Sequence, residues 1–316
     1  RIEMKHYLSI NDVDSLPAWV EEAITLKQNP LQDNALGKGK TICLLFFNNS
    51  LRTRLSTQKA AMNLGMEVMV MNFGSEGWVL EYEDGTIMDQ GTSEHIKEAA
   101  RVVSQYCDVV AIRAFAKLKD KAKDEAEEVL TGFAKYASVP VVNMESSTAH
   151  PLQALADAIT LKEFNTKINP KVVLSWAPHP KALPHAVANS FVEMMKLQNA
   201  NFVITHPEGY ELNSEITKGC TIEYDQKRAL ENADFIYVKN WCSYSEYGKV
   251  LKQDSSWMMT QAKLGGAKFM HCLPVRRNVV VEDAVLDSDQ SLVVHQANNR
   301  TFSAQIVLKK ILQNLS

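Results

Sequence analysis

The sequence predicts an α/β fold of two domains, each built on a parallel β-sheet with helices on both faces. The chain has 316 residues, more than a single domain usually contains. Short apolar runs recur along it, and amphipathic segments of helical length separate most of them. Alternating strands and helices are typical of parallel sheets.

The apolar runs are expected to be buried strands, because both of their faces are apolar. Nine of them fit two sheets better than one. They are residues 41–47, 67–71, 108–113, 139–144, 171–177, 202–205, 235–239, 268–272 and 292–295.

The amphipathic segments are predicted helices. Examples are residues 51–64, 93–106, 151–164, 184–196, 228–232 and 301–315. The helix at 151–164 lies between the two sets of strands, so we expect it to connect the domains. The predicted domains are residues 1–147, completed by a C-terminal helix at 299–316, and residues 148–298.

The overall composition indicates which partners and which cellular compartment to expect. The net charge of −3 gives no global field toward nucleic acid or an anionic membrane. The five cysteines are odd in number and form no CxxC pair, which indicates a reducing, cytoplasmic setting. The N-terminal segment does not resemble a signal peptide, and no run is long and apolar enough to span a bilayer. We expect no metal and no cofactor, since no ligand cluster has metal spacing and no GxGxxG occurs.

An anion site is predicted directly after the first strand. There the chain reads Ser50, Leu51, Arg52, Thr53, Arg54 and then becomes helical. A helix N-terminus offers unpaired N–H groups, and hydroxyl and guanidinium donors suit phosphate oxygens. The alternative is that Ser50 only caps the helix and the arginines are solvated.

Polar groups also follow the other predicted strands. Taken singly, a histidine there is usually structural, an arginine a surface charge and a cysteine a small core residue. Together they predict a site, because ligands bind beyond the carboxyl ends of parallel strands. These residues are Arg113, Glu145, His150, Gln153, His179, Lys239, His271, Cys272, Arg276, Arg277, Asn298, Asn299 and Arg300.

Three motifs resemble those of the aspartate/ornithine carbamoyltransferase family. Residues 50–54 resemble its SxRTR motif, residues 150–153 its HPxQ motif, and residues 271–274 the HCLP motif of the ornithine branch. Arg113 and Arg300 lie where the family places two further arginines. The resemblance spans nearly the whole chain. It implies a carbamoyl phosphate domain, a domain for the amino substrate, and a homotrimer with active sites at subunit interfaces.

The chain departs from the ornithine enzymes in one segment. They carry Ser-Met-Gly to hold the free ends of ornithine, whereas this sequence has none and reads KNWCSY at 239–244. It resembles instead the transferases of N-acylated ornithine. In that branch the positions of Glu145, His179, Lys239 and Arg276 hold the acylated substrate, and a tryptophan matching Trp78 reaches carbamoyl phosphate from a neighbouring subunit.

Two positions bear on the acyl group. The acetyl enzymes carry a glutamate near the position of Ser93 and a modified lysine at that of Val280. The succinyl enzyme has a proline at the Ser93 position, so neither pattern matches fully. A serine leaves room for a longer acyl chain and does not repel its carboxylate. We therefore expect Ser93 to contact N-succinyl-L-ornithine, in arginine biosynthesis, with N-acetyl-L-ornithine as the alternative.

The resemblance also implies a role for each site residue. Thr53, Arg113 and His150 would stabilise charge on the carbamoyl oxygen. Gln153 would hold the carbamoyl amide, and Cys272 with Leu273 would position the attacking amine without covalent catalysis. The residues expected to bind carbamoyl phosphate are Ser50, Leu51, Arg52, Thr53, Trp78, Arg113, His150, Gln153, Cys272, Leu273 and Arg300. The acylornithine contacts would be Glu145, His179, Lys239, Arg276, Cys272, Leu273 and Ser93.

Two other interpretations remain at this point. One is a carbamoyltransferase-like binding protein without catalysis, although the expected catalytic residues are all present. The other is an enzyme that runs the reaction backwards, by phosphorolysis of a citrulline derivative, since one site serves both directions.

Overall fold

The computed structural model describes residues 6–251 and 254–315, so part of the N-terminal segment discussed above lies outside the described residues. The chain divides into two compact units. Unit 1 contains residues 6–117, 122–152 and 300–315, and unit 2 contains residues 118–121 and 153–299, apart from the two undescribed positions. The predicted α/β class with parallel sheets is confirmed.

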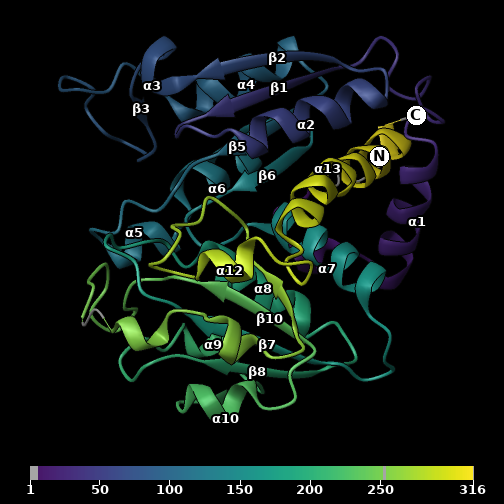
Figure 1. Ribbon diagram of the computed structural model, residues 1–316. Helices are drawn as coiled ribbons and strands as arrows, with labels where there is room; N and C mark the ends of the chain where they lie inside the picture. Colours follow the sequence, from purple (N-terminus) through teal and green to yellow (C-terminus); the bar gives the residue numbers. More distant parts are fainter. Residues whose placement is uncertain (1–5, 252–253, 316) are drawn as a thin grey trace. The chain divides into compact units, whose positions relative to one another are not determined.

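Unit 1 is built on a four-stranded parallel sheet in the order β2-β1-β5-β6. Its strands are β1 (Thr41–Phe46), β2 (Glu67–Asn72), β5 (Val109–Arg113) and β6 (Val141–Glu145). Figure 1 shows helix α2 in front of this sheet and α4 behind it. The helices of this unit therefore cover both faces of its sheet.

The alternation of side chains along the strands explains this layering. Cys43 and Leu45 on β1 point to the face where Ile96 of α4 and Phe133 of α6 pack. The intervening Leu44 is also fully buried, on the opposite face. The helices of unit 1 are η1 (Ile10–Asp12), α1 (Leu16–Gln28), α2 (Arg52–Asn63), α3 (Phe73–Glu76), α4 (Ile96–Tyr106) and α6 (Glu128–Tyr136).

Unit 2 is built on a five-stranded parallel sheet in the order β11-β10-β7-β8-β9. Its strands are β7 (Lys171–Trp176), β8 (Asn201–Thr205), β9 (Thr221–Glu223), β10 (Phe235–Lys239) and β11 (Lys268–Met270). Its shorter helices are α8 (Ala186–Met195), α9 (Ser214–Thr217), α10 (Gln226–Leu230), η2 (Ser255–Trp257), α11 (Gln261–Leu264) and α12 (Asp283–Leu286). A short helix, α5 (Lys121–Glu125), lies where the chain passes back into unit 1.

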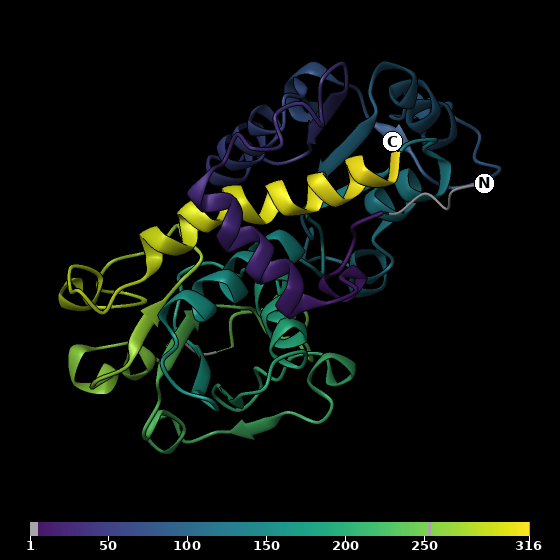
Figure 2. The ribbon, with the colours of Figure 1, turned by 90° about the vertical axis from the view of Figure 1, so that its right-hand side faces the viewer.

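Two helices pass from one unit to the other along the chain. Helix α7 (Pro151–Phe164) begins in unit 1 and continues in unit 2, and α13 (Val293–Leu315) runs in the opposite sense. The C-terminal part of α13 packs beside α1 in unit 1, as Figure 2 shows. There Glu22 accepts ion pairs from Lys309 and Lys310.

One predicted strand is wrong. Residues 292–295 were expected to be a strand, but α13 begins at Val293. Leu292, Val293, Gln296 and Arg300 are buried at helical spacing, which a four-residue window with two valines does not reveal. The other eight predicted strands are present within a few residues, while β9 and the two-residue strands at 80–81 and 94–95 were not predicted.

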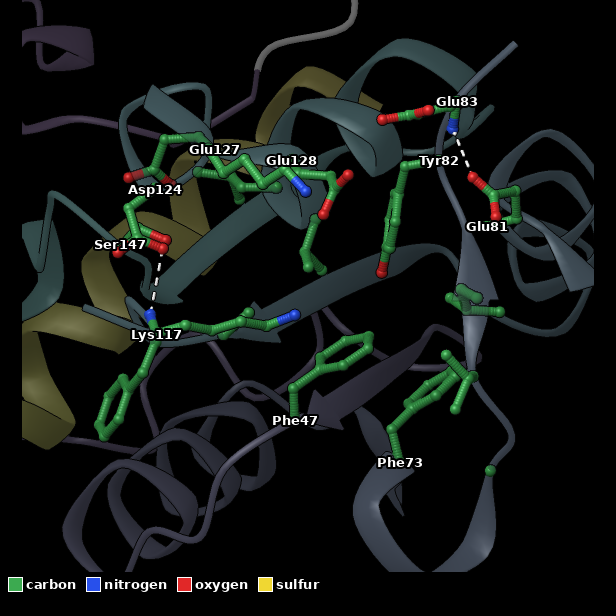
Figure 3. A pocket seen from close by; sticks show the side chains of 18 of the residues that line it. Phe47, Phe73, Glu81, Tyr82, Glu83, Lys117, Asp124, Glu127, Glu128 and Ser147 are labelled. Carbon is green, nitrogen blue, oxygen red and sulfur yellow. Dashed lines mark hydrogen bonds between the residues drawn. The ribbon is translucent and has the colours of Figure 1, made fainter. Parts of the chain in front are cut away.

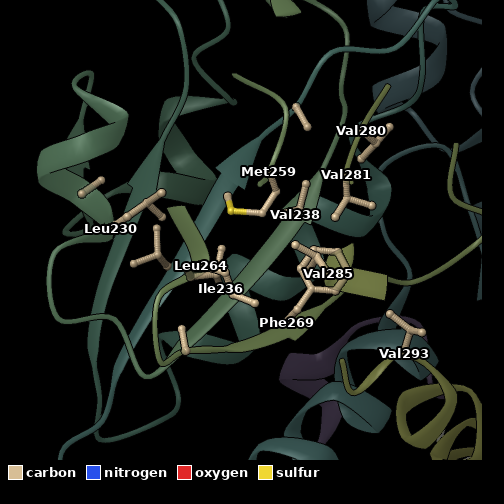
Figure 4. Packing of buried hydrophobic residues seen from close by; sticks show 14 of the residues in the cluster. Leu230, Ile236, Val238, Met259, Leu264, Phe269, Val280, Val281, Val285 and Val293 are labelled. Atoms are coloured by element: carbon tan, nitrogen blue, oxygen red, sulfur yellow. The ribbon is translucent and has the colours of Figure 1, made fainter. Parts of the chain in front are cut away.

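The core on one face of the unit 2 sheet is aliphatic apart from one ring. Figure 4 shows Ile236 and Val238 of β10 packed with Phe269 of β11 and with Val285 of α12. Phe269 is fully buried. Its ring therefore fills a space that the smaller side chains around it could not fill.

We expect Phe269→Ala to destabilise the protein by about 3–5 kcal/mol, because it removes buried area and leaves a cavity. Urea denaturation followed by circular dichroism measures this. Ile168→Ala is the control, since Ile168 is almost fully exposed, and should change stability by less than about 0.5 kcal/mol. Equal midpoints for both variants would contradict this packing.

Candidate active site

In unit 1, the candidate site lies at the carboxyl ends of β1 and β5. These strands are adjacent. From β1 the chain goes to β2 on one side, and it later returns past β1 to β5 on the other side. Such a reversal of strand order is where open α/β sheets bind ligands. Phe46 and Arg113 are partners in the register, so the loop after β1 and the Arg113 side chain start from the same edge.

Thr53 is the centre of this site. It lies in the first turn of α2 and is almost completely buried. Its Oγ1 accepts hydrogen bonds from Arg113 Nη1 at 3.1 Å and from Arg300 Nη2 at 2.7 Å. Two guanidinium groups, from a strand end and from α13, therefore converge on one hydroxyl.

A carboxylate and a histidine complete the cluster. Glu145 Oε2 lies 2.7 Å from Arg113 Nη1 and 3.6 Å from His150 Nε2. Arg113, Glu145 and His150 are all buried, and so is Arg300, at 4% exposure. Both guanidinium groups lie in a buried place, where water screens their charges little. This favours an anionic ligand.

The backbone at Glu145 is unusual. Its φ of 141° lies in a region that side chains other than glycine rarely adopt, and the pairing register shifts between Ile112 and Arg113 opposite it. Strain of this kind persists where surrounding contacts hold it, often at functional sites. Here the Arg113 ion pair holds the Glu145 carboxylate inside the cluster.

The residues before Thr53 are more open. Ser50 Oγ accepts the Thr53 N–H at 3.2 Å, so Ser50 contacts the first turn of α2. Leu51 is exposed, while Arg52 and Arg54 are half-buried. Arg300 reaches the site from the middle of α13 and not from a strand end, which corrects its expected position.

Trp78 and Ser93 lie apart from this cluster, on a segment of residues 77–95 that we call the strap. Its strands β3 (Leu80–Glu81) and β4 (Glu94–His95) pair in parallel. Trp78 Nε1 donates to Glu94 Oε2 at 3.1 Å, and the Ser93 N–H donates to the Val79 carbonyl at 2.9 Å. Both side chains are exposed, Trp78 by 56%. The strap thus carries the two residues together.

A cavity of about 660 Å³ opens under the strap. Figure 3 shows Phe47, Phe73, Tyr82 and Lys117 around it. Burial raises the pKa of the Tyr82 hydroxyl well above its ordinary value and also raises that of the Glu127 carboxyl. Trp78 lines this cavity, whereas the Thr53 cluster does not.

Unit 2 has its own group of basic side chains, which lie at or after the ends of its strands. His179 follows β7, Lys239 ends β10, and these strands are adjacent at the reversal of strand order. Arg276 Nε donates to His179 Nε2 at 3.2 Å. Burial lowers the pKa of His179; its hydrogen bond to the Lys181 backbone opposes this, and nearby Lys239 and Arg276 lower it further. A neutral His179 can accept from Arg276.

The HCLP segment follows β11 in the same unit. His271 is buried, and its Nδ1 accepts the Leu273 N–H at 2.8 Å. Leu273 has a φ of 61° and precedes a cis peptide bond to Pro274. Cys272 is partly exposed and forms no disulfide. This tight turn fixes the backbone of the residues expected to position the amine.

Gln153 lies in α7, and Asp157 of the next helical turn holds its side chain. Its Nε2 donates to Asp157 Oδ1 at 2.9 Å, which also accepts from Gln296 Nε2 at 2.9 Å. Asp157, Gln296 and Lys181 were missed by the sequence interpretation. The spacing of Gln153 and Asp157, four residues apart in a predicted helix, would have placed them on one helix face.

Within residues 6–251 and 254–315, no group of three or more histidine, cysteine, aspartate or glutamate side chains is arranged to hold a metal ion. In the same part of the chain, no helix is both long enough and apolar enough to cross a membrane.

Comparison with known proteins agrees with this geometry. Two family models match: the carbamoyl-P binding domain of aspartate/ornithine carbamoyltransferase at residues 5–163, and its Asp/Orn binding domain at residues 184–311. The N-succinylornithine carbamoyltransferase of Bacteroides thetaiotaomicron is 46% identical, over 99% of this chain and 100% of that protein. The N-acetylornithine carbamoyltransferase of Xanthomonas campestris pv. campestris is 35% identical, over 98% of each chain.

Solved structures give the same result. A crystal structure of acetylornithine transcarbamylase complexed with acetylcitrulline superposes with a TM-score of 0.92 at 34% identity, covering 98% of this chain and 99% of that one. With matching models for both domains and relatives similar along their whole length, this chain belongs to the aspartate/ornithine carbamoyltransferase family.

Proposed function

We propose that this protein transfers the carbamoyl group of carbamoyl phosphate to the δ-amine of N-succinyl-L-ornithine, giving N-succinyl-L-citrulline and phosphate, in arginine biosynthesis. The observation that carries the proposal is the convergence of Arg113 and Arg300 on buried Thr53. It supplies a site for a small dianion in a chain 46% identical to an N-succinylornithine carbamoyltransferase. The five cysteines form no disulfide, which fits a cytoplasmic setting.

In this proposal the domain of residues 1–147 and 299–316 binds carbamoyl phosphate. Arg300 and Arg52, with Ser50 and backbone N–H groups from Leu51 onward, bind the phosphate, because a helix N-terminus and forked donors suit its oxygens. Thr53, Arg113 and His150 donate to the carbamoyl oxygen, where negative charge grows as the amine attacks. Donors already fixed in a buried site stabilise such charge without reorganising.

The domain of residues 148–298 binds the acylornithine. Lys239 and Arg276 supply two positive charges, and N-succinylornithine carries two carboxylates where N-acetylornithine carries one. His179, held neutral beside Arg276, accepts hydrogen bonds and adds no charge. Glu145 contacts the acylornithine as well as Arg113.

The attacking amine is neutral when it reaches the carbamoyl carbon. Cys272 and Leu273 orient it through the turn that follows β11, and Gln153 holds the carbamoyl amide. As the C–N bond forms and the C–O bond to phosphate breaks, the departing phosphate accepts the amine proton. No covalent enzyme intermediate is needed, because phosphate is already a good leaving group.

Ser93 determines the acyl group in this proposal. Among the solved structures similar to this chain is a glutamate-to-serine variant of N-acetyl-L-ornithine transcarbamylase, complexed with carbamyl phosphate and N-succinyl-L-norvaline, at a TM-score of 0.92. A short, neutral Ser93 accommodates a succinyl carboxylate in the same way. We further propose a homotrimer in which the exposed Trp78 reaches the site of a neighbouring subunit. Ser93 would cross with it, because one strap holds both residues.

We expect turnover with N-succinyl-L-ornithine and little with N-acetyl-L-ornithine or ornithine when the three are assayed in parallel with carbamoyl phosphate. Citrulline-group formation is the measurement. A preference for N-acetyl-L-ornithine would replace the proposed acceptor. No turnover with any of them would favour a binding protein that lacks catalysis.

We expect Ser93→Glu to lower kcat/KM for N-succinyl-L-ornithine at least about tenfold, because it sets a like charge against the succinyl carboxylate. Ser93→Ala, which adds no charge, is the matched control and should stay near wild type. Equal effects of the two variants would show that Ser93 does not contact the acyl group.

We expect Arg300→Gln to raise KM for carbamoyl phosphate about 10- to 100-fold, because it removes a buried, charge-assisted donor from the anion site. Steady-state kinetics at saturating acylornithine measure it. Arg101→Gln is the control, since Arg101 is an exposed arginine of α4 that lies over the Tyr136 ring. An unchanged KM in Arg300→Gln would remove Arg300 from the phosphate site.

A further inference from the structure

Within unit 2, hydrogen bonds connect the HCLP segment to the buried side chains of Gln296, Asp157 and Gln153 in turn. The His271 backbone N–H donates to Gln296 Oε1 at 3.0 Å. Gln296 Nε2 donates to Asp157 Oδ1 at 2.9 Å, and Gln153 Nε2 donates to the same oxygen at 2.9 Å. We call Gln296, Asp157 and Gln153 the relay.

The relay is shielded from water. Asp157 is 0% exposed, and Gln153 and Gln296 are at most 2% exposed. A buried polar group that loses its partner keeps its full desolvation cost, so these hydrogen bonds hold their side chains in one arrangement. The relay is therefore a fixed part of the unit, and its members cannot rotate independently.

The direction of every hydrogen bond in the relay follows from the His271 backbone N–H, which donates to Gln296. A backbone N–H can only donate, so Gln296 must turn its oxygen toward His271 and its amide nitrogen toward Asp157. An ionised carboxylate can only accept. Gln153 must therefore also turn its amide nitrogen toward Asp157, which leaves its Oε1 on the opposite side of the amide.

We propose that Asp157 and Gln296 are positioning residues that orient the Gln153 amide so that its oxygen accepts an N–H of the carbamoyl group. The inference rests on the proposed function, in which Gln153 contacts that group. An amide turned the other way would present a donor, which suits a carbonyl oxygen and not an NH₂. The relay thus selects carbamoyl phosphate over acyl phosphates that carry a methyl group in place of NH₂.

The relay also connects the carbamoyl contact to the segment that positions the amine. The same His271 that anchors Gln296 through its N–H accepts the Leu273 N–H at its Nδ1. His271 therefore helps to fix both the turn that positions the incoming amine and the Gln153 amide that contacts the carbamoyl NH₂. A shift in either would disturb the hydrogen bonds of the other.

The test compares two stable analogues that differ only in the group read by Gln153. Phosphonoacetamide carries NH₂ where acetonylphosphonate carries CH₃. Isothermal titration calorimetry on the full-length protein gives the ratio of their dissociation constants. We expect the wild type to prefer phosphonoacetamide about fivefold, the effect of one hydrogen bond. Gln153→Met should abolish this preference.

The decisive variant exchanges the acid and the amide within the relay. In Asp157→Asn combined with Gln296→Glu, residue 296 presents only acceptors, so the new amide at 157 must turn its nitrogen inward. Gln153 then turns its oxygen toward residue 157 and its nitrogen toward the ligand. Size and net charge are unchanged, yet the preference should fall to one or below. Asp157→Asn alone should stay within about twofold of wild type, because Gln296 still holds the oxygen of residue 157 in place.

Thr160→Val is the matched control. Thr160 and Asn299 bridge the same two helices one turn further along, at 2.9 Å, outside the relay. The control should lose stability without changing the analogue ratio. If the exchange variant does not fold, Asp157→Asn with Gln296→Met releases the orientation and should bring the ratio close to one.

The outcomes separate the two levels of inference. If the wild type binds neither analogue, the proposed carbamoyl phosphate site is wrong, and the relay proposal fails with it. If the wild type prefers phosphonoacetamide, Gln153→Met abolishes that preference and the exchange variant keeps it, the site stands and the relay proposal is overturned.

Discussion

The convergence of Arg113 and Arg300 on Thr53 is the constraint around which unit 1 is organised. Two buried guanidinium groups repel each other unless carboxylates and bound anions offset their charge. Glu145 offsets the charge of Arg113. Every member of this cluster is buried, and hydrogen bonds to charged groups are strong where water is excluded.

The parallel sheets place this chemistry. Each sheet reverses its strand order once, between β1 and β5 in unit 1 and between β7 and β10 in unit 2. The carboxyl ends on either side of a reversal diverge and leave room for a ligand. Arg113 lies at one of these points, and His179 and Lys239 lie at the other. The same topological feature therefore brings basic side chains to the strand ends in each unit.

In the proposed function, the residues that select the acyl group and the carbamoyl group lie outside these sheets. Ser93 and Trp78 belong to the exposed strap, while the orientation of Gln153 depends on Asp157 and Gln296 of two long helices. In the proposed function, a fixed reaction centre and a separate recognition segment would let the acyl group vary while the carbamoyl contacts stay the same. The similarity of this chain to both succinyl- and acetylornithine enzymes fits that division.

The sequence by itself determined the α/β class, eight of the strands and the motifs at their ends, because buried strands and strand-end polar residues are local patterns. It misplaced Arg300, since two valines in a short window hid the helical spacing of α13. It missed Asp157 and Gln296, which lie 139 residues apart and meet only through packing of α7 and α13. Only the tertiary structure decided which donors share one acceptor, because hydrogen-bond direction is set by partners distant in the chain.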